Sequence, residues 1–234
     1  MKLLAIDTST ERMSLAVQNG EHTVTHQGAA GAQASAHLID AVLGLLQQAN
    51  VSLPSLQAIA FGQGPGAFTG LRTACSVSQG LALGLNIPMV PVDTLLCIAQ
   101  SAEPAHHRVM SVLDARMGQV YSAAYERTSA GWSTVDKPLL SRPDELRWPA
   151  QWQDQPVLLT GNAVISLAKE LAHLHHPQVS VQEQWPDARA MLTLAAAAWQ
   201  RGDCIAAADA APVYIRDEVA RTTAQRLADK QAQP

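Results

Sequence analysis

The sequence predicts an α/β protein made of two units, in each of which helices flank a mixed sheet. The chain has 234 residues, of which 47% are hydrophobic. This is enough for one large domain or two small ones with a complete core. Short apolar runs, which indicate strands, occur among longer amphipathic runs, which indicate helices. Residues 103–107 separate the two sets of elements.

The first unit, residues 1–103, opens with three strands and continues with alternating helices and strands. Asn19-Gly20 is typical of a two-residue hairpin turn, and Ser35 is a candidate helix cap. The expected strands span residues 2–6, 13–18, 23–26, 56–61 and 88–92. The expected helices span residues 35–48, 69–85 and 94–101. Three antiparallel strands followed by helix, strand, helix and strand are the layout of a ribonuclease-H-like unit.

The second unit, residues 104–234, repeats this pattern only loosely. Its expected strands span residues 109–113, 120–126, 134–139 and 157–160. Its expected helices span residues 142–146, 165–173 and 188–200, and the C-terminal helices are candidates to pack back on the first unit. Two such units in tandem predict the two-lobed architecture of the actin and sugar-kinase type.

Composition narrows the classes of function. The net charge is −4 and no basic run occurs, which argues against a protein that binds nucleic acid without a partner. Three cysteines without a CxxC pattern fit a reducing compartment and exclude a zinc site built from cysteines only. The first apolar run is too short for a signal peptide or a membrane span, so we expect a cytoplasmic protein. Separately, we expect neither a metal nor a cofactor.

The loop GQGPGAFTGLR follows the fourth strand and leads into a helix. Gly62, Gly64 and Gly66 can adopt positive φ angles and expose backbone N–H groups, and Thr69 can cap the helix that follows. A helix N-terminus attracts anions, so phosphate binding is one interpretation. The loop lacks a P-loop lysine and dinucleotide-type glycine spacing, which favours the other interpretation, a tight strand-to-helix turn.

The helix after this loop carries a row of small residues. Arg72, Ser76, Gly80 and Gly84 are four residues apart and therefore lie on one face. Glycine inside a helix costs about 1 kcal/mol relative to alanine, and close approach of another helix would offset that cost. The facing helix belongs either to this chain, with residues 35–48 as the candidate, or to another subunit.

Three carboxylates lie at strand ends, where α/β folds place their chemistry. Asp7 ends the first strand, Asp93 follows the fifth, and Asp114 ends the first strand of the second unit. A two-metal nuclease would need three or four clustered carboxylates, and only Asp7 has the expected place. Helix capping and turn formation are the structural interpretations of Asp93 and Asp114.

Five motifs together resemble one family. GQGPGAFTGLR resembles the GxGPGSFTGxR signature of the bacterial TsaB family, also called YeaZ. LLAIDTST, LALGLNIPMVPVDTL, LDARMGQVY and PVYIRDEVA are similar to that family in kind and order. The resemblance implies the actin-like ATPase fold and a role in making N6-threonylcarbamoyladenosine at position 37 of tRNAs that read codons starting with A. It implies a heterodimer with the catalytic paralogue TsaD, joined by the ATPase TsaE.

Departures from the paralogue favour a subunit without catalytic activity. Thr94 and Ile98 occupy the places of the two metal-binding histidines of TsaD, and neither can replace such a ligand. Asp114-Ala115-Arg116-Met117 stands where TsaD has a phosphate-binding Ser-Gly-Gly-His. Ser9 replaces a glycine of actin-like ATPases. Ala34 occupies the place of a histidine of many TsaB members, so no role of that histidine is carried over.

We therefore expect an activating scaffold that dimerises with TsaD, forms a homodimer when alone, and meets tRNA only through the complex. The rival interpretations are an ATP-dependent small-molecule kinase and a peptidase. The partner surface is expected on the two long helices of the first unit, with the candidates His37, Leu38, Ala41, Leu45, Thr69, Arg72, Ser76, Gly80, Leu83 and Gly84. The candidate remnants of nucleotide-binding loops are Asp7, Ser9, Gly62, Gly64, Gly66, Asp114 and Arg116.

Overall fold

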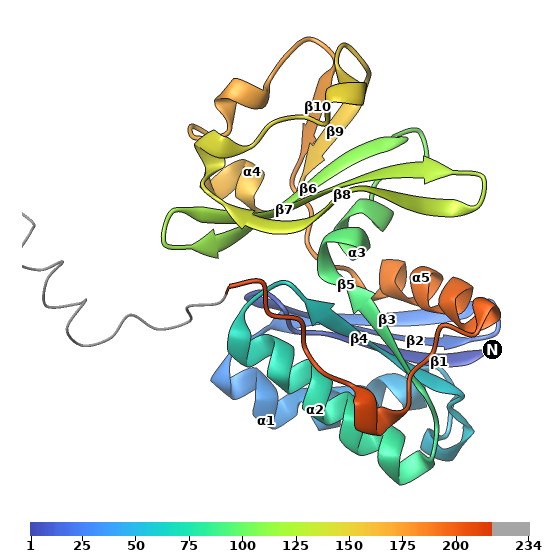
Figure 1. Cartoon of the computed structure of the whole chain (residues 1–234). Coiled ribbons are helices and arrows are strands. Elements are labelled where there is room, and N and C mark those ends of the chain that lie inside the picture. The colour runs from blue at the N-terminus through green and yellow to red at the C-terminus, as the bar shows by residue number, and fades with distance from the viewer. Residues whose placement is uncertain (217–234) are drawn as a thin grey trace, which may run out of the picture.

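A computed structural model of the chain describes residues 1–216, apart from the side chains of residues 32–36. Residues 217–220 of the PVYIRDEVA motif and the side chains of Ser35 and Ala34 therefore lie outside the described part. Within it, the chain forms two lobes, each built on one five-stranded mixed sheet (Figure 1). The expected two-lobed α/β fold, actin-like and ribonuclease-H-like, is confirmed.

The first five strands of the chain form one sheet and the next five form the other. The first sheet contains β1 (Lys2–Asp7), β2 (Arg12–Asn19), β3 (His22–Ala29), β4 (Ala58–Gly64) and β5 (Met89–Asp93). The second sheet contains β6 (Arg108–Arg116), β7 (Gln119–Thr128), β8 (Gly131–Ser141), β9 (Val157–Thr160) and β10 (Val179–Gln182). The helices are α1 (Ala32–Gln48), α2 (Phe68–Leu85), α3 (Thr94–Gln100), α4 (Ala163–Ser166) and α5 (Ala188–Arg201).

Both sheets have the same topology, although their sequences share no clear repeat. The strand orders are β3-β2-β1-β4-β5 and β10-β9-β6-β7-β8, so the first strand of each lobe is central. In each lobe that strand pairs antiparallel with the second strand and parallel with the fourth. The repeat is thus one of strand order, which a comparison of residues does not detect.

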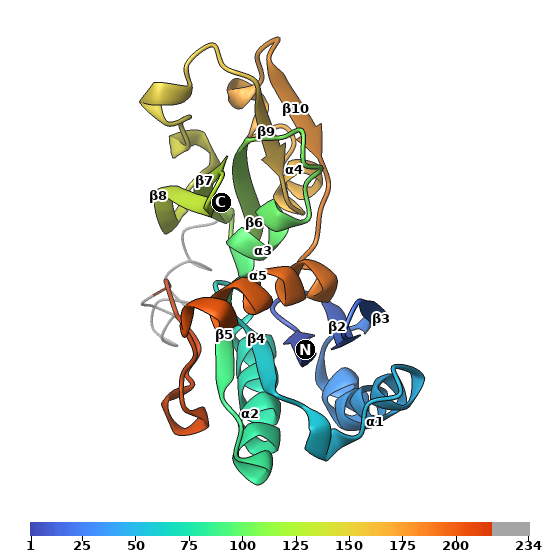
Figure 2. The same ribbon diagram turned by 90° about the vertical axis from the view of Figure 1, so that its right-hand side faces the viewer.

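Strand alternation divides the first lobe into two core layers. Leu4 and Ile6 of β1 point to the layer formed with α1 and α2, whereas Leu3 and Ala5 point to the layer formed with α5. This is the period of two expected for a strand that is buried on both faces. Figure 2 shows α5 lying across the sheet on the side away from α2.

The last helix of each lobe packs on the sheet of the other lobe. Leu95 and Ile98 of α3 pack against Val109 and Tyr125 of the second sheet. In turn α5, which follows β10, packs on the first sheet through Met191, Leu192 and its alanines. The two helices also contact one another, so they form the hinge side of the molecule.

The second lobe differs from the prediction in two elements. The helix expected at residues 165–173 is only α4 and a 3-10 turn at Ala172–Leu174, because the backbone leaves the helical region at Leu167 (φ −124°, ψ 31°). Leu171 and Leu174 still reach the core of the second lobe, through turns. β10 was not expected, since it is a four-residue strand that forms by pairing with β9.

The other errors concern helix starts. α1 begins at Ala32, with Gly31 rather than Ser35 at the cap position. α2 begins at Phe68, so Thr69 lies inside the helix and does not cap it. No helix of residues 1–216 is long and apolar enough to cross a bilayer.

Candidate functional site

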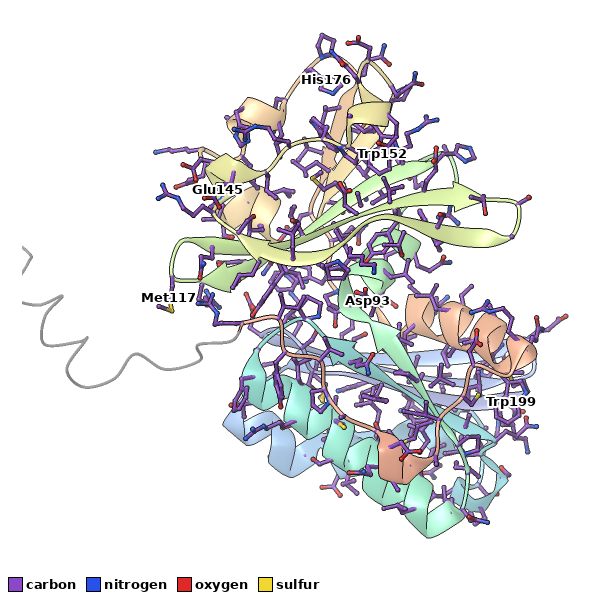
Figure 3. The ribbon with its side chains drawn as sticks, in the orientation of Figure 1. Asp93, Met117, Glu145, Trp152, His176 and Trp199 are labelled. Atoms are coloured by element: carbon purple, nitrogen blue, oxygen red, sulfur yellow. The ribbon has the colours of Figure 1, made fainter. Side chains whose placement is uncertain are left out.

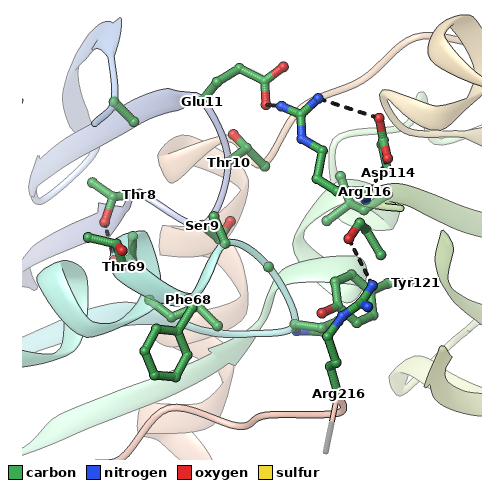
Figure 4. Close-up of a pocket in the computed structure, with 18 of the residues that line it drawn as sticks. Thr8, Ser9, Thr10, Glu11, Phe68, Thr69, Asp114, Arg116, Tyr121 and Arg216 are labelled. Carbon is green, nitrogen blue, oxygen red and sulfur yellow. Dashed lines mark hydrogen bonds and ion pairs between the residues drawn. The ribbon is translucent and has the colours of Figure 1, made fainter. Parts of the chain in front are cut away.

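A cavity of about 450 Å³ lies between the two lobes. Four segments line it: residues 8–11 after β1, residues 65–71 of the glycine loop and α2, residues 113–117 at the β6–β7 turn, and residues 213–216 near the end of the described chain. Figure 4 shows side chains from both lobes directed into this space. The structure therefore gathers at one cleft segments that are far apart in the sequence.

The glycine loop approaches the turn after β1 so closely that side chains would not fit. A Cβ on Gly62 would overlap the Asp7 carboxylate, one on Gly66 the Ser9 carbonyl, and one on Gly70 the Thr8 carbonyl. Of the three glycines expected to adopt positive φ, only Gly64 does so, at 119°. The glycines are thus required mainly for close packing of two backbones, which supports the tight-turn interpretation.

Asp7 ends β1 beneath the cleft and does not line the cavity. Its Oδ1 accepts hydrogen bonds from the Ser9 backbone N–H at 3.0 Å and from Ser9 Oγ at 2.7 Å. Its Oδ2 is buried and has no hydrogen-bond partner among the described residues. Burial raises the pKa of Asp7 to about 6, and the two bonds from Ser9 oppose this rise only in part. The side chain holds the turn in shape.

Asp93 joins the two lobes on the hinge side. Its Oδ1 caps α3 by accepting bonds from the N–H groups of Leu95 and Leu96, at 2.8 and 3.2 Å. Its Oδ2 accepts a bond of 2.9 Å from the Tyr125 hydroxyl of the second lobe. Burial raises the pKa of Asp93. The helix-capping interpretation is confirmed, and Figure 3 shows the residue at the junction between the lobes.

Asp114 forms the β6–β7 turn at the opposite end of the cleft. Its Oδ1 accepts a bond of 2.7 Å from the Arg116 N–H, so the turn-forming interpretation is also confirmed. The Arg116 guanidinium lies 3.7 Å from Asp114 and 3.7 Å from Glu11 of the first lobe. Arg116 and Met117 adopt left-handed backbone angles, with φ of 64° and 57°. The Arg116 amide is therefore bonded within the turn itself.

Four backbone donors beside the cleft are occupied by the protein itself. The Ser9 and Arg116 amides donate to the carboxylates of Asp7 and Asp114. The Ala67 amide donates to the Ser9 carbonyl at 2.7 Å, and the Asp114 amide donates to Asn162 Oδ1 at 2.9 Å. A phosphate that used these four amides would have to displace these bonds, and the cavity that it entered is lined by Glu11 and Asp114 as well as by Arg116 and Arg216.

The predicted loop residues thus divide into two groups. The cavity is lined by Ser9, Gly66, Asp114 and Arg116. It is not lined by Asp7, Gly62 or Gly64, of which Gly62 packs on the Asp7 carboxylate. Sequence reasoning missed Glu11, Tyr121, Asn162 and residues 213–216. The only signal for the last segment was its place in PVYIRDEVA, which had no assigned role. No group of three His, Cys, Asp or Glu side chains within residues 1–216 is placed to hold a metal ion.

The predicted partner surface lies on the outer face of α1 and α2. Ser76, Gly80 and Gly84 are exposed, and no atom lies within 4 Å of a Cβ built on either glycine, so the row does not face this chain's own core. Leu83 is 58% exposed. The exposed set also includes His37, Thr69 and Arg72, and Ala41 is half-buried.

Two of the expected surface residues are core residues. Leu38 and Leu45 of α1 are buried against the first sheet, so they cannot contact a partner. The apolar face of α1 is wide because Ile39 and Leu43 extend it, and these two side chains are 40% and 46% exposed. They, rather than Leu38 and Leu45, are the apolar side chains that α1 presents outward.

The fold and the cleft define a two-lobed α/β protein of the actin-like, ribonuclease-H-like class. A model of the TsaD family, described as tRNA N6-adenosine threonylcarbamoyltransferase, matches residues 25–224. The TsaB protein of Escherichia coli is 34% identical over 94% of this chain and 96% of its own length. The TsaB protein of Haemophilus influenzae is 30% identical over 94% of this chain and 95% of its own length.

Solved structures agree with these sequence relatives. The structure of YeaZ from Pseudomonas aeruginosa superposes with a TM-score of 0.83 at 34% identity, covering 91% of this chain and 99% of that one. A second structure, of a protein described as similar to peptidase YeaZ from Pseudomonas aeruginosa, gives a TM-score of 0.84 at 33% identity, covering 92% of this chain and 99% of that one. The chain belongs to the TsaB family, also called YeaZ.

The raised pKa of Asp7 predicts a specific pH dependence of stability. A carboxyl whose folded-state pKa lies above its ordinary value near 3.8 contributes stability that is fully present below that value and is lost as the pH rises through about 6. Lowering the pH from 7.5 to 4.5 should therefore raise the free energy of unfolding of the wild type by about 2 kcal/mol relative to Asp7→Asn. Urea unfolding of both proteins at the two pH values measures this difference. Parallel pH profiles would contradict the burial of an ionisable Asp7.

The occupied backbone donors predict weak nucleotide binding. Isothermal titration of the isolated protein with Mg-ATP should give a dissociation constant well above about 10 μM, which corresponds to a binding free energy weaker than roughly −7 kcal/mol. Binding near or below that concentration would show that the cleft can release its own hydrogen bonds to a phosphate.

Proposed function

We propose that this protein is a non-catalytic scaffold that activates a TsaD paralogue in the formation of N6-threonylcarbamoyladenosine at position 37 of tRNAs reading ANN codons. The observation that carries the proposal is a contrast between two regions. The Ser9, Ala67 and Arg116 amides of the loops that would bind phosphate donate to the chain itself, whereas the small-residue row of α2 is exposed. The family supports the pathway, because its curated relatives are described as threonylcarbamoyladenosine biosynthesis proteins.

Geometry supports docking through α1 and α2. A helix face with Ser76, Gly80 and Gly84 lets a second helix approach closely, and the exposed Leu83, Ile39 and Leu43 supply apolar contacts beside it. Two helices from each subunit would form a four-helix interface around a pseudo-two-fold axis. TsaD, which resembles this chain, and a second copy of the chain would compete for this face. The ATPase TsaE joins the heterodimer, and tRNA is bound only through the complex.

The rival activities lack support in the site. A kinase of this fold needs a working phosphate loop in each lobe, and here both loops use their own amides. A peptidase needs an activated nucleophile or a metal. Burial raises the pKa of the Cys75, Cys97 and Cys204 thiols, which disfavours the reactive thiolate. Assays of ATP hydrolysis and peptide cleavage on the purified protein test these rivals directly.

The proposed pathway predicts a defined change in tRNA. Depletion of the protein from its host should remove threonylcarbamoyladenosine from tRNA, while the precursor that TsaD consumes persists. Mass spectrometry of tRNA nucleosides and of the precursor measures both. Restoring the wild-type protein should restore the modified nucleoside. Unchanged modification after depletion would show that the pathway is wrong.

The proposed interface predicts that Gly80→Leu separates folding from association. The site is exposed and open, and leucine is favoured over glycine inside a helix by up to about 1 kcal/mol, so the melting temperature should be unchanged or raised. In a close helix contact the added side chain should weaken association by about 1–3 kcal/mol. Sedimentation of the protein alone and with TsaD measures the loss.

Ala197→Leu is the matched control, because Ala197 is an exposed helical position on α5, away from α1 and α2. This variant should associate like the wild type. Equal association of the Gly80→Leu protein and the control would move the interface to another surface. A lower melting temperature for Gly80→Leu would instead contradict the open position of the glycine.

A further inference from the structure

Residues 211–216, named here the C-terminal strap, run from the first lobe to the mouth of the cleft. The strap begins beside β4, where the Val213 N–H donates to the Gln63 carbonyl at 2.8 Å and Gln63 Nε2 donates to the Ala211 carbonyl at 3.2 Å. Figure 1 shows it rising along α2 toward the space between the lobes. These backbone contacts fix the start of the strap on the first lobe.

Tyr214 anchors the middle of the strap on the first turns of α2. Its hydroxyl accepts a bond of 3.0 Å from Arg72 Nε, and its ring centroid lies 5.0 Å from that of Phe68. The Arg72 guanidinium lies 3.8 Å from the centre of the Phe68 ring, within the range of a cation–π interaction. The three side chains therefore form one stacked group that holds the strap against the helix.

Arg216 carries the strap across to the second lobe. Its Nη2 donates to the Ala115 carbonyl at 3.0 Å, and its Nη1 lies 3.5 Å from the Met117 sulfur. Both partners belong to the β6–β7 turn, from which Arg116 reaches back to Glu11 of the first lobe. Figure 4 shows Arg216 and Arg116 on either side of the cavity. Two arginines thus connect the lobes across the open end of the cleft.

The contacts of Arg216 and Arg116 lie far from the covalent connections between the lobes. The lobes are joined covalently near α3 and α5, where Asp93 also bonds Tyr125. Figure 3 shows Asp93 at this junction and Met117 well away from it, at the far end of the cleft. A contact at the end farthest from a hinge opposes rotation of the lobes more effectively than a contact beside the hinge.

We propose that the C-terminal strap is a clasp that holds the two lobes closed over the cleft, with Arg216 as the catch on the second lobe. Val213, Tyr214, Ile215 and Arg216 form one wall of the cavity, so release of the clasp both frees the lobes to rotate and opens the cavity. A hydrogen bond from a charged donor is among the stronger single contacts available, and its loss shifts an open–closed equilibrium about five- to tenfold.

The test measures the distance between the lobes in the full-length protein. Spin labels are placed at Asp40→Cys on α1 and Glu145→Cys on the second lobe, which are exposed positions. Cys204 is changed to serine, whereas Cys75 and Cys97 are buried and escape labelling. An excess of unlabelled protein restricts pulsed electron–electron resonance to distances within one copy. The amide exchange of Val213, which reports release of the strap, is measured by mass spectrometry in the same variants.

Arg216→Ala should add a population of longer distances, about five to ten times larger than in the wild type, and should speed exchange at Val213. Tyr214→Phe, which keeps the ring but removes the bond to Arg72, should produce a smaller change in the same direction. The matched control is Arg201→Ala, because Arg201 is an exposed arginine that pairs locally with Asp203 at 2.7 Å. This control should resemble the wild type.

Two results would overturn the clasp. Unchanged distance distributions in Arg216→Ala together with faster exchange at Val213 would show that the strap detaches without holding the lobes. Unchanged distances and unchanged exchange in both strap variants would show that neither anchor contributes to closure.

Discussion

The close contact between the glycine loop and the turn after β1 determines the rest of this structure. Gly66 and Gly70 pack directly on the carbonyl groups of Ser9 and Thr8, and Gly62 packs on the carboxylate of Asp7. This contact sets where α2 begins, and α2 in turn supplies one wall of the cleft and the exposed small-residue row. The same contact also uses the Ala67 amide, a donor that an anion would otherwise find at the helix start.

A second constraint follows from the exchange of helices between the lobes. Because α3 packs on the second sheet and α5 on the first, neither lobe completes its core from a continuous stretch of sequence. The two lobes therefore depend on one another for folding, while the far side of the cleft is bridged by the polar contacts of Arg116 and Arg216 and by Ile215, which packs on the core of the second lobe. This arrangement places rigidity at the hinge and leaves the mouth of the cleft to Glu11, Arg116 and the strap.

The chemistry of the cleft is consistent with a protein that acts through its surfaces. Each loop that could present amides to a phosphate instead folds around its own aspartate, Asp7 in one lobe and Asp114 in the other. At the same time the outer face of α2 carries glycines that cost helix stability, and no other segment of the described chain packs on them. These two features are the basis of the proposed role in assembly.

The sequence by itself determined the two-lobed class and most of the elements, because periodicity and glycine spacing are local properties of the chain. It placed Ser76, Gly80 and Gly84 in one row, but left open whether that row faces this chain or another subunit. It also offered helix capping and turn formation as the structural interpretations of Asp93 and Asp114, since both side chains act on neighbouring amides. It did not separate Leu38 and Leu45 from Ile39 and Leu43, because a wide apolar stripe does not reveal which part a sheet covers. Only the tertiary structure decided that question, the reason for each glycine, and the meeting of Arg216 with Ala115, since these depend on contacts between segments far apart in the chain.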